Sequence, residues 1–138
     1  MTNMLGEYVG ELKGKITSRR VLDVTDGPNL EVNVTREGKL KGAEITELLT
    51  YSTAMNSDGS WFGHGKGVIM TKDGSDTATF TGAGIGHFTG PAKVKYAGSM
   101  FFGLSKGKLE FLNNSVLLFE IDINLETLDD NIKLWEWK

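Results

Sequence analysis

The stretch that decides the fold runs from Gly59 to Gly90 and reads GSWFGHGKGVIMTKDGSDTATFTGAGIGHFTG. Asp73-Gly74, near its centre, is typical of a tight turn between two antiparallel strands. If these two residues form the turn, Lys72 pairs with Ser75, and the facing positions follow along both strands. The sequence therefore predicts one hairpin and fixes which of its side chains share a face.

Glycines alternate along one face of this predicted hairpin. Gly63 lies opposite Gly84, and Gly65 lies opposite Gly82. The same face also carries Trp61, Gly67, Ile69, Phe80, Gly86 and Phe88. Alternating glycine weakens a strand unless the missing side chains leave space that is needed. The stripe predicts either a curved hairpin filled from across a barrel or a concave wall that a ligand approaches. In both cases this face points inward.

The rest of the chain alternates strand-length segments with turn signals. The segments span roughly 14–24, 29–37, 39–56, 60–72, 75–89, 93–103, 107–112, 115–125 and 131–138. The further turn signals are Asp26-Gly27-Pro28, Glu37-Gly38, Asp58-Gly59, Gly90-Pro91, Lys106-Gly107, Asn113-Asn114 and Asp129-Asp130-Asn131. Short strands at this spacing are typical of a barrel or sandwich. Helical spacing occurs only at the start, where apolar residues between Met4 and Leu12 predict a short turn or helix that Gly6 and Gly10 weaken.

Length and composition set the class of protein. With 138 residues and 15.1 kDa, the chain predicts one domain spanning 1–138. Its net charge is −3 and its basic residues are scattered among acids, which argues against a nucleic-acid partner. The absence of cysteine excludes disulfides and cysteine nucleophiles. The apolar run 116–119 is far too short to span a membrane, and the N-terminus has no signal-peptide pattern, so we expect a cytoplasmic protein without a membrane partner.

Several stretches resemble a small prokaryotic family of uncharacterised proteins. They are GKGVIMTKDG at 65–74, ATFTGAGIG at 78–86, GKLEFLNN at 107–114 and KLWEWK at 133–138. The resemblance covers most of the chain from about residue 13, and it implies a barrel similar to that of allene oxide cyclase that can form a homodimer. It supplies no activity. Together with the strand pattern it predicts an all-β fold, a single small antiparallel barrel of about eight strands, lipocalin-like, with little helix.

The leading functional prediction is a barrel that binds an apolar or amphipathic small molecule and uses no cofactor. Its expected binding residues are Trp61, Gly63, Gly65, Phe80, Gly84, Phe88, Phe101 and Trp135, with Trp137 as a further wall residue. An interior cavity of about 300 Å³ or more would favour this function, because pockets for drug-sized ligands begin at that size.

Two alternatives stay open. One is an isomerase- or cyclase-type enzyme that uses Tyr51 and a carboxylate, either Glu47 pointing inward or Glu120, which is expected outside. The other is an interaction domain whose barrel is filled solid. A metal site is not expected, because His64 and His87 lie about 13 Å apart along the predicted hairpin.

Overall fold

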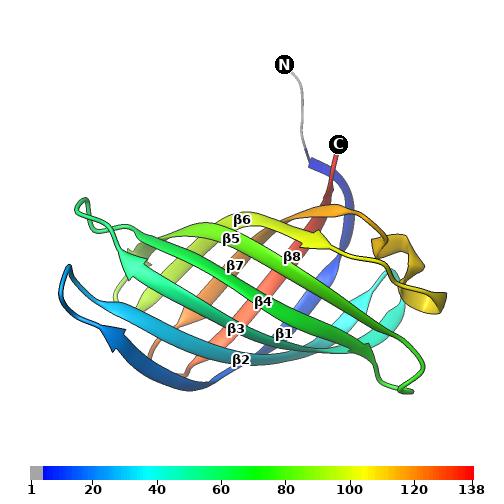
Figure 1. Cartoon of the computed structure of the whole chain (residues 1–138), viewed down its shortest axis with the longest axis horizontal. Helices are drawn as coiled ribbons and strands as arrows, with labels where there is room; N and C mark the ends of the chain where they lie inside the picture. Colours follow the sequence, from blue (N-terminus) through cyan, green and yellow to red (C-terminus); the bar gives the residue numbers. More distant parts are fainter. Residues whose placement is uncertain (1–4) are drawn as a thin grey trace.

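Residues 5–138 are described by the computed structural model, and within them eight antiparallel strands close into one barrel (Figure 1). The strands follow one another around the barrel in chain order, and the last pairs with the first. They are β1 Leu5–Asp23, β2 Asn29–Leu40, β3 Ala43–Met55, β4 Trp61–Thr71, β5 Thr77–Gly90, β6 Lys93–Phe102, β7 Val116–Asn124 and β8 Asp129–Trp137. The predicted all-β barrel of about eight strands is confirmed.

The β4–β5 hairpin has the predicted register. Gly63 pairs with Gly84, and Gly65 pairs with Gly82. The loop is longer than two residues, because the ladder ends at Met70 and Thr77 and is followed by a hydrogen bond from the Thr71 amide to the Asp76 carbonyl. The turn chemistry at Asp73 still operates, since its carboxylate accepts hydrogen bonds from Ser75.

The N-terminal segment is a strand and not the expected turn or helix. β1 starts at Leu5, and it pairs with β8 with register shifts on either side of Tyr8. These irregularities let Val9 and Leu12 reach the core while Tyr8 stays half exposed. The helix-like spacing is therefore produced by an irregular strand. Met4 lies outside the described residues.

The predicted strand at 107–112 is also wrong. Gly107–Leu112 forms a 3-10 helix, η1, whose Leu109 and Leu112 are fully buried in the core. Residues three apart lie on one side of a 3-10 helix, so both leucines point the same way. The amide of Lys108 donates to the Asp76 carboxylate and ties η1 to the β4–β5 loop. The segment thus covers one end of the barrel instead of adding a strand to its wall.

Two turn predictions and one strand prediction need correction. Glu37-Gly38 lies inside β2, and Asp129-Asp130-Asn131 begins β8. The segment 39–56 is divided at Lys41 and Gly42, whose φ values of 46° and 83° suit a two-residue turn that needs positive φ at both positions.

The two ends of the barrel differ (Figure 1). One end carries η1, the β4–β5 loop and both ends of the described chain. The opposite end carries the short connections between β1 and β2 and between β3 and β4. We call this second end the mouth, because Phe88, an aromatic side chain of the inner face, is 56% exposed there.

Candidate functional site

The glycine stripe faces the inside of the barrel, as predicted. Ile69 and Phe80, on the same face as the glycines, are buried, whereas Phe62 and Ile85 on the other face are about 40% exposed. The space above the glycines is occupied by side chains from other strands. A Cβ at Gly86 would lie 2.7 Å from the ring of Tyr96, for example. Most of these side chains come from the adjacent strand, and those over Gly63 and Gly84 come from two strands away, so neighbouring strands fill the stripe and not strands across the barrel.

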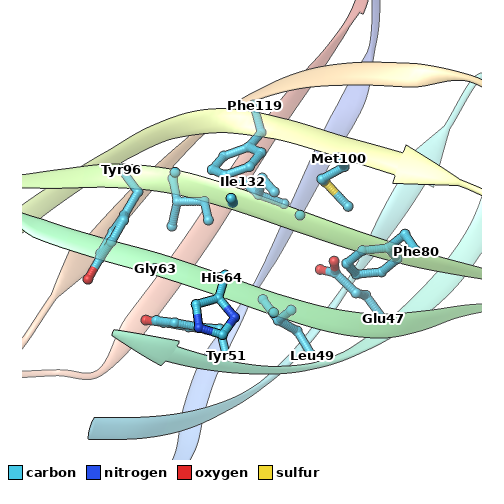
Figure 2. A pocket seen from close by; sticks show the side chains of 15 residues that line it. Glu47, Leu49, Tyr51, Gly63, His64, Phe80, Tyr96, Met100, Phe119 and Ile132 are labelled. Carbon is cyan, nitrogen blue, oxygen red and sulfur yellow. The ribbon is translucent and has the colours of Figure 1, made fainter. Parts of the chain in front are cut away.

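A small cavity remains beneath the stripe. Its volume is about 50 Å³. The side chains around it include Glu47, Leu49, Tyr51, Phe80, Tyr96, Met100, Phe119 and Ile132 (Figure 2). Gly63, Gly65, Gly82 and Gly84 form its roof. A site of this size holds a few water molecules or a small polar group, because one water needs about 10–15 Å³. We call this space the inner cavity.

A second pocket of about 140 Å³ lies at the mouth. It is lined by Ile16, Arg19, Leu30, Val32, Tyr51, Thr53, Trp61, Phe88, Val94, Tyr96, Ile123 and Leu125. These residues come from seven of the eight strands and from the turn after β7. Apart from Arg19 the lining is aliphatic, aromatic or hydroxyl-bearing, so this mouth pocket suits an apolar group. It is about as large as an engineered apolar cavity that takes up benzene.

Two tyrosines separate the mouth pocket from the inner cavity. Tyr51 and Tyr96 line both spaces, and their rings meet edge to face with centroids 6.0 Å apart. The Tyr96 hydroxyl lies 2.7 Å from the Thr53 hydroxyl. In Figure 2 both phenol oxygens lie toward the same end of the cavity, and Glu47 lies at the other. Burial and the nearby Asp130 carboxylate raise the pKa of Tyr51, whereas Arg36 and Arg19 act in the opposite direction.

A buried ionic cluster borders the inner cavity. Arg36 Nη1 lies 2.5 Å from Glu47 Oε1, and Arg36 Nε lies 2.8 Å from Asp130 Oδ1. All three side chains are at most 1% exposed. Burial lowers the pKa of Arg36, but the two carboxylates outweigh it and raise the pKa overall. Burial raises the pKa of Asp130, although Arg36 opposes this. One guanidinium thus holds two carboxylates in the interior.

Glu47 contributes an unpartnered acceptor to the inner cavity. Its Oε1 is bound by Arg36, while Oε2 is buried and has no hydrogen-bond partner among the described residues. The expectation that Glu47 points inward is therefore confirmed. Arg36 and Asp130 were not predicted. A signal did exist for Arg36, because it continues the inward alternation of Val32 and Val34, and a buried arginine requires a carboxylate.

The predicted binding residues separate into two groups. Trp61, Gly63, Gly65, Phe80, Gly84 and Phe88 line the mouth pocket or the inner cavity. The placement of Phe101 and Trp135 on the inner wall is wrong. Phe101 is 51% exposed between the buried Met100 and Phe102, and Trp135 packs against Tyr8 beside the fully buried Leu134. Strand alternation sends each of these two rings to the outside.

The remaining candidates lie on the outer surface. Glu120 is partly exposed and its carboxylate lies 3.8 Å from Lys95, as expected of an outward residue. Trp137 is 55% exposed. His64 and His87 are exposed, and residues 5–138 contain no group of three side chains that could hold a metal ion. Within the same residues no helix is long and apolar enough to cross a membrane.

No family model and no curated protein matches the chain. Solved structures of bacterial proteins do. A protein of unknown function from Clostridium acetobutylicum has a TM-score of 0.81 at 13% identity, over 99% of this chain and 100% of that one. A conserved protein of unknown function from Rhodopseudomonas palustris has a TM-score of 0.78 at 11% identity, over 99% of both chains. A β-barrel-like protein from Acinetobacter baumannii has a TM-score of 0.77 at 16% identity, over 100% of this chain and 98% of that one. These similarities establish the fold alone, and they agree with the resemblance to uncharacterised barrel proteins.

Proposed function

We propose that this protein binds a small apolar or amphipathic molecule whose apolar part occupies the mouth pocket. The observation that carries the proposal is the contrast between the two barrel ends. One end is covered by η1 with its buried leucines, whereas the other presents an apolar pocket of about 140 Å³ with Trp61 and Phe88 at its rim. A pocket open at one end of a small barrel is a common site for a single ligand.

Cavity size limits the class of ligand. Neither space inside the barrel reaches the roughly 300 Å³ at which pockets for drug-sized ligands begin. The mouth pocket matches one six-membered ring or a short branched chain. The inner cavity has room only for a small substituent that passes the pair formed by Tyr51 and Tyr96. The proposal is therefore a ring-sized ligand, and a long lipid is not expected.

The test uses 2-phenylethanol as a neutral, ring-sized probe. A W135F/W137F double variant leaves Trp61 as the sole tryptophan, because the chain has three. We expect the probe to change the Trp61 emission and to raise the melting temperature, since a ligand that binds only the folded state stabilises it. Treatment with a chelator should change neither result.

A matched pair of variants locates the site. Leu30 lies at the rim of the mouth pocket, and Leu48 lies on the outer face of β3, where it is 45% exposed. Leu30→Phe should fill part of the mouth pocket and weaken binding, whereas Leu48→Phe should leave binding unchanged. If a panel of ring-sized compounds alters neither the emission nor the melting temperature of the W135F/W137F protein, the filled interaction domain becomes the better account.

Glu47 supports a second candidate function, the isomerase- or cyclase-type enzyme. Its free Oε2 at the inner cavity could remove a proton next to a carbonyl group that is small enough to pass the tyrosine pair. Acetone in deuterated water tests this, because removal of an α-proton by the carboxylate and return of a deuteron from solvent replaces C–H by C–D. Exchange that exceeds the rate with free acetate and disappears in Glu47→Gln would support catalysis. Exchange equal in both proteins would exclude it.

The cytoplasmic location and the homodimer stay predictions.

A further inference from the structure

An extra residue in β1 turns Arg19 toward the mouth pocket. Ile16 pairs with Val34 and Ser18 pairs with Asn33, so Thr17 is additional on the β1 side. Such a bulge reverses the alternation beyond it. Without it, Ser18 and Arg20 would share the inner face with Ile16. With it, Arg19 lies opposite the buried Val32 and projects to the same side of the sheet.

The neighbouring arginine has the opposite environment. Arg20 pairs with Glu31 across the outer face, with its Nη2 3.0 Å from the Glu31 carboxylate. The Arg19 side chain has no hydrogen-bond or ion-pair partner among residues 5–138. The two adjacent arginines therefore differ: the charge of Arg20 is neutralised on the outer face, whereas the charge of Arg19 is not neutralised at the mouth pocket.

Arg19 is also the single charge in the lining of the mouth pocket as residues 5–138 define it. The guanidinium lies close enough to the Tyr51 hydroxyl to influence it electrostatically. Deeper in the barrel the charge has the opposite sign, because one guanidinium, of Arg36, faces two carboxylates. An anionic group is therefore favoured at the rim and disfavoured at depth.

We propose that Arg19 binds the carboxylate of a small aromatic or alicyclic acid whose ring fills the mouth pocket. This inference rests on the proposed function and names the ligand class. The guanidinium offers paired N–H donors that match a carboxylate, while Trp61, Phe88 and Leu30 surround the ring. The ligand enters ring first, because the acidic interior would repel its charged end.

Three probes that share one phenethyl skeleton test the charge preference. They are phenylacetate, 2-phenylethanol and 2-phenylethylammonium, compared at pH 7 and low ionic strength through the Trp61 emission of the W135F/W137F protein. We expect phenylacetate to bind about tenfold more tightly than the alcohol, and the ammonium to bind most weakly. Added salt should weaken the binding of phenylacetate but not that of 2-phenylethanol, because salt screens an exposed charge pair.

Arg19→Gln is the decisive variant, and Arg20→Gln is its matched control. Arg19→Gln should remove the tenfold preference for phenylacetate while the alcohol binds as before. Arg20→Gln should preserve it, although the net charge changes equally. If the protein with both arginines binds phenylacetate and the alcohol equally, the role of Arg19 is overturned. The same holds if both variants lose the preference for phenylacetate equally. Either result would leave the proposed binding function intact. Failure of all three probes to bind would overturn the proposed function itself.

Discussion

Gly84 leaves the space into which Phe119 extends from β7, two strands away, across the intervening Gly98 of β6. A Cβ placed on Gly84 would lie 2.9 Å from Cζ of Phe119 and 2.8 Å from the carbonyl oxygen of Ala97. The first contact is with a ring that lies over Gly98 on the inner wall, and the second is with the neighbouring strand β6. A backbone oxygen cannot move away cheaply, so this position requires glycine.

Gly84→Val should therefore destabilise the protein. Overpacking of this kind costs about 1–3 kcal/mol, and urea unfolding would measure the loss. Gly90→Val is the control, because nothing lies within 4 Å of a Cβ at Gly90 and its φ is not positive. Valine there should be neutral or slightly stabilising, since it favours strand structure. A Gly84→Val protein as stable as the original would contradict the packing described here.

Removal of residues 132–138 should prevent folding. β8 joins β7 to β1, so its loss exposes two unpaired strand edges and removes the buried Ile132 and Leu134. We expect the truncated chain to be insoluble, as measured by soluble yield and the melting transition. Deletion of Lys138 alone, which lies beyond the end of β8, should change nothing. An unchanged melting temperature after the longer deletion would show that β8 is dispensable.

Asp129 and Asp130 should change stability with pH in opposite directions. The pKa of buried Asp130 is raised, so the folded state holds its proton longer, and stability from this group falls as pH rises through the folded pKa. A hydrogen bond from Lys15 lowers the pKa of exposed Asp129, so its contribution is present above the ordinary pKa and is lost as pH falls.

Two variants separate these effects. Relative to the original protein, Asp130→Asn should become more stable as pH rises from about 4 to 7, whereas Asp129→Asn should become less stable over the same window. Urea unfolding at several pH values measures both differences. A difference for Asp130→Asn that is flat or falls with pH would contradict the raised pKa of Asp130 in the folded state.

Arg36→Met should be among the most damaging single changes. It leaves two buried carboxylates without a cation, and breaking a buried ion pair on one side costs about 3–5 kcal/mol. The triple variant Arg36→Met/Glu47→Leu/Asp130→Leu removes all three charges and should recover much of this loss. Denaturant unfolding compares the two. A triple variant no more stable than Arg36→Met would show that the cluster does more than neutralise itself.

Local sequence patterns predicted much of this barrel correctly. The turn residues around Asp73 and the alternation of Gly63, Gly65, Gly82 and Gly84 were sufficient for the register and the inward face of one hairpin. These features depend on neighbours within a few positions across a short turn, so they can be derived without knowing the rest of the fold. Period-two alternation also placed Glu47 inside and Glu120 outside.

The errors arose where local pattern and final environment differ. Leu109 and Phe111 alternate as in a short strand, but the two buried leucines of η1 are three residues apart, and only the open end of a barrel gives them a place to be buried together. Phe101 and Trp135 are aromatic residues in strands, and their type does not reveal on which side of the wall they lie. The bulge at Thr17 turns Arg19 inward, and no turn residue near it in the sequence would have predicted it.

By itself, therefore, the sequence determined the class of fold, the β4–β5 register and the inward glycine face, because alternation and turn chemistry are local properties. Tertiary structure alone decided which side chains meet in the interior. Arg36 and Asp130 are 94 positions apart, and they come together because β8 closes the barrel against β1. The sizes of the inner cavity and the mouth pocket follow from the same closure, since strand tilt and stagger set the space that side chains from all strands must fill.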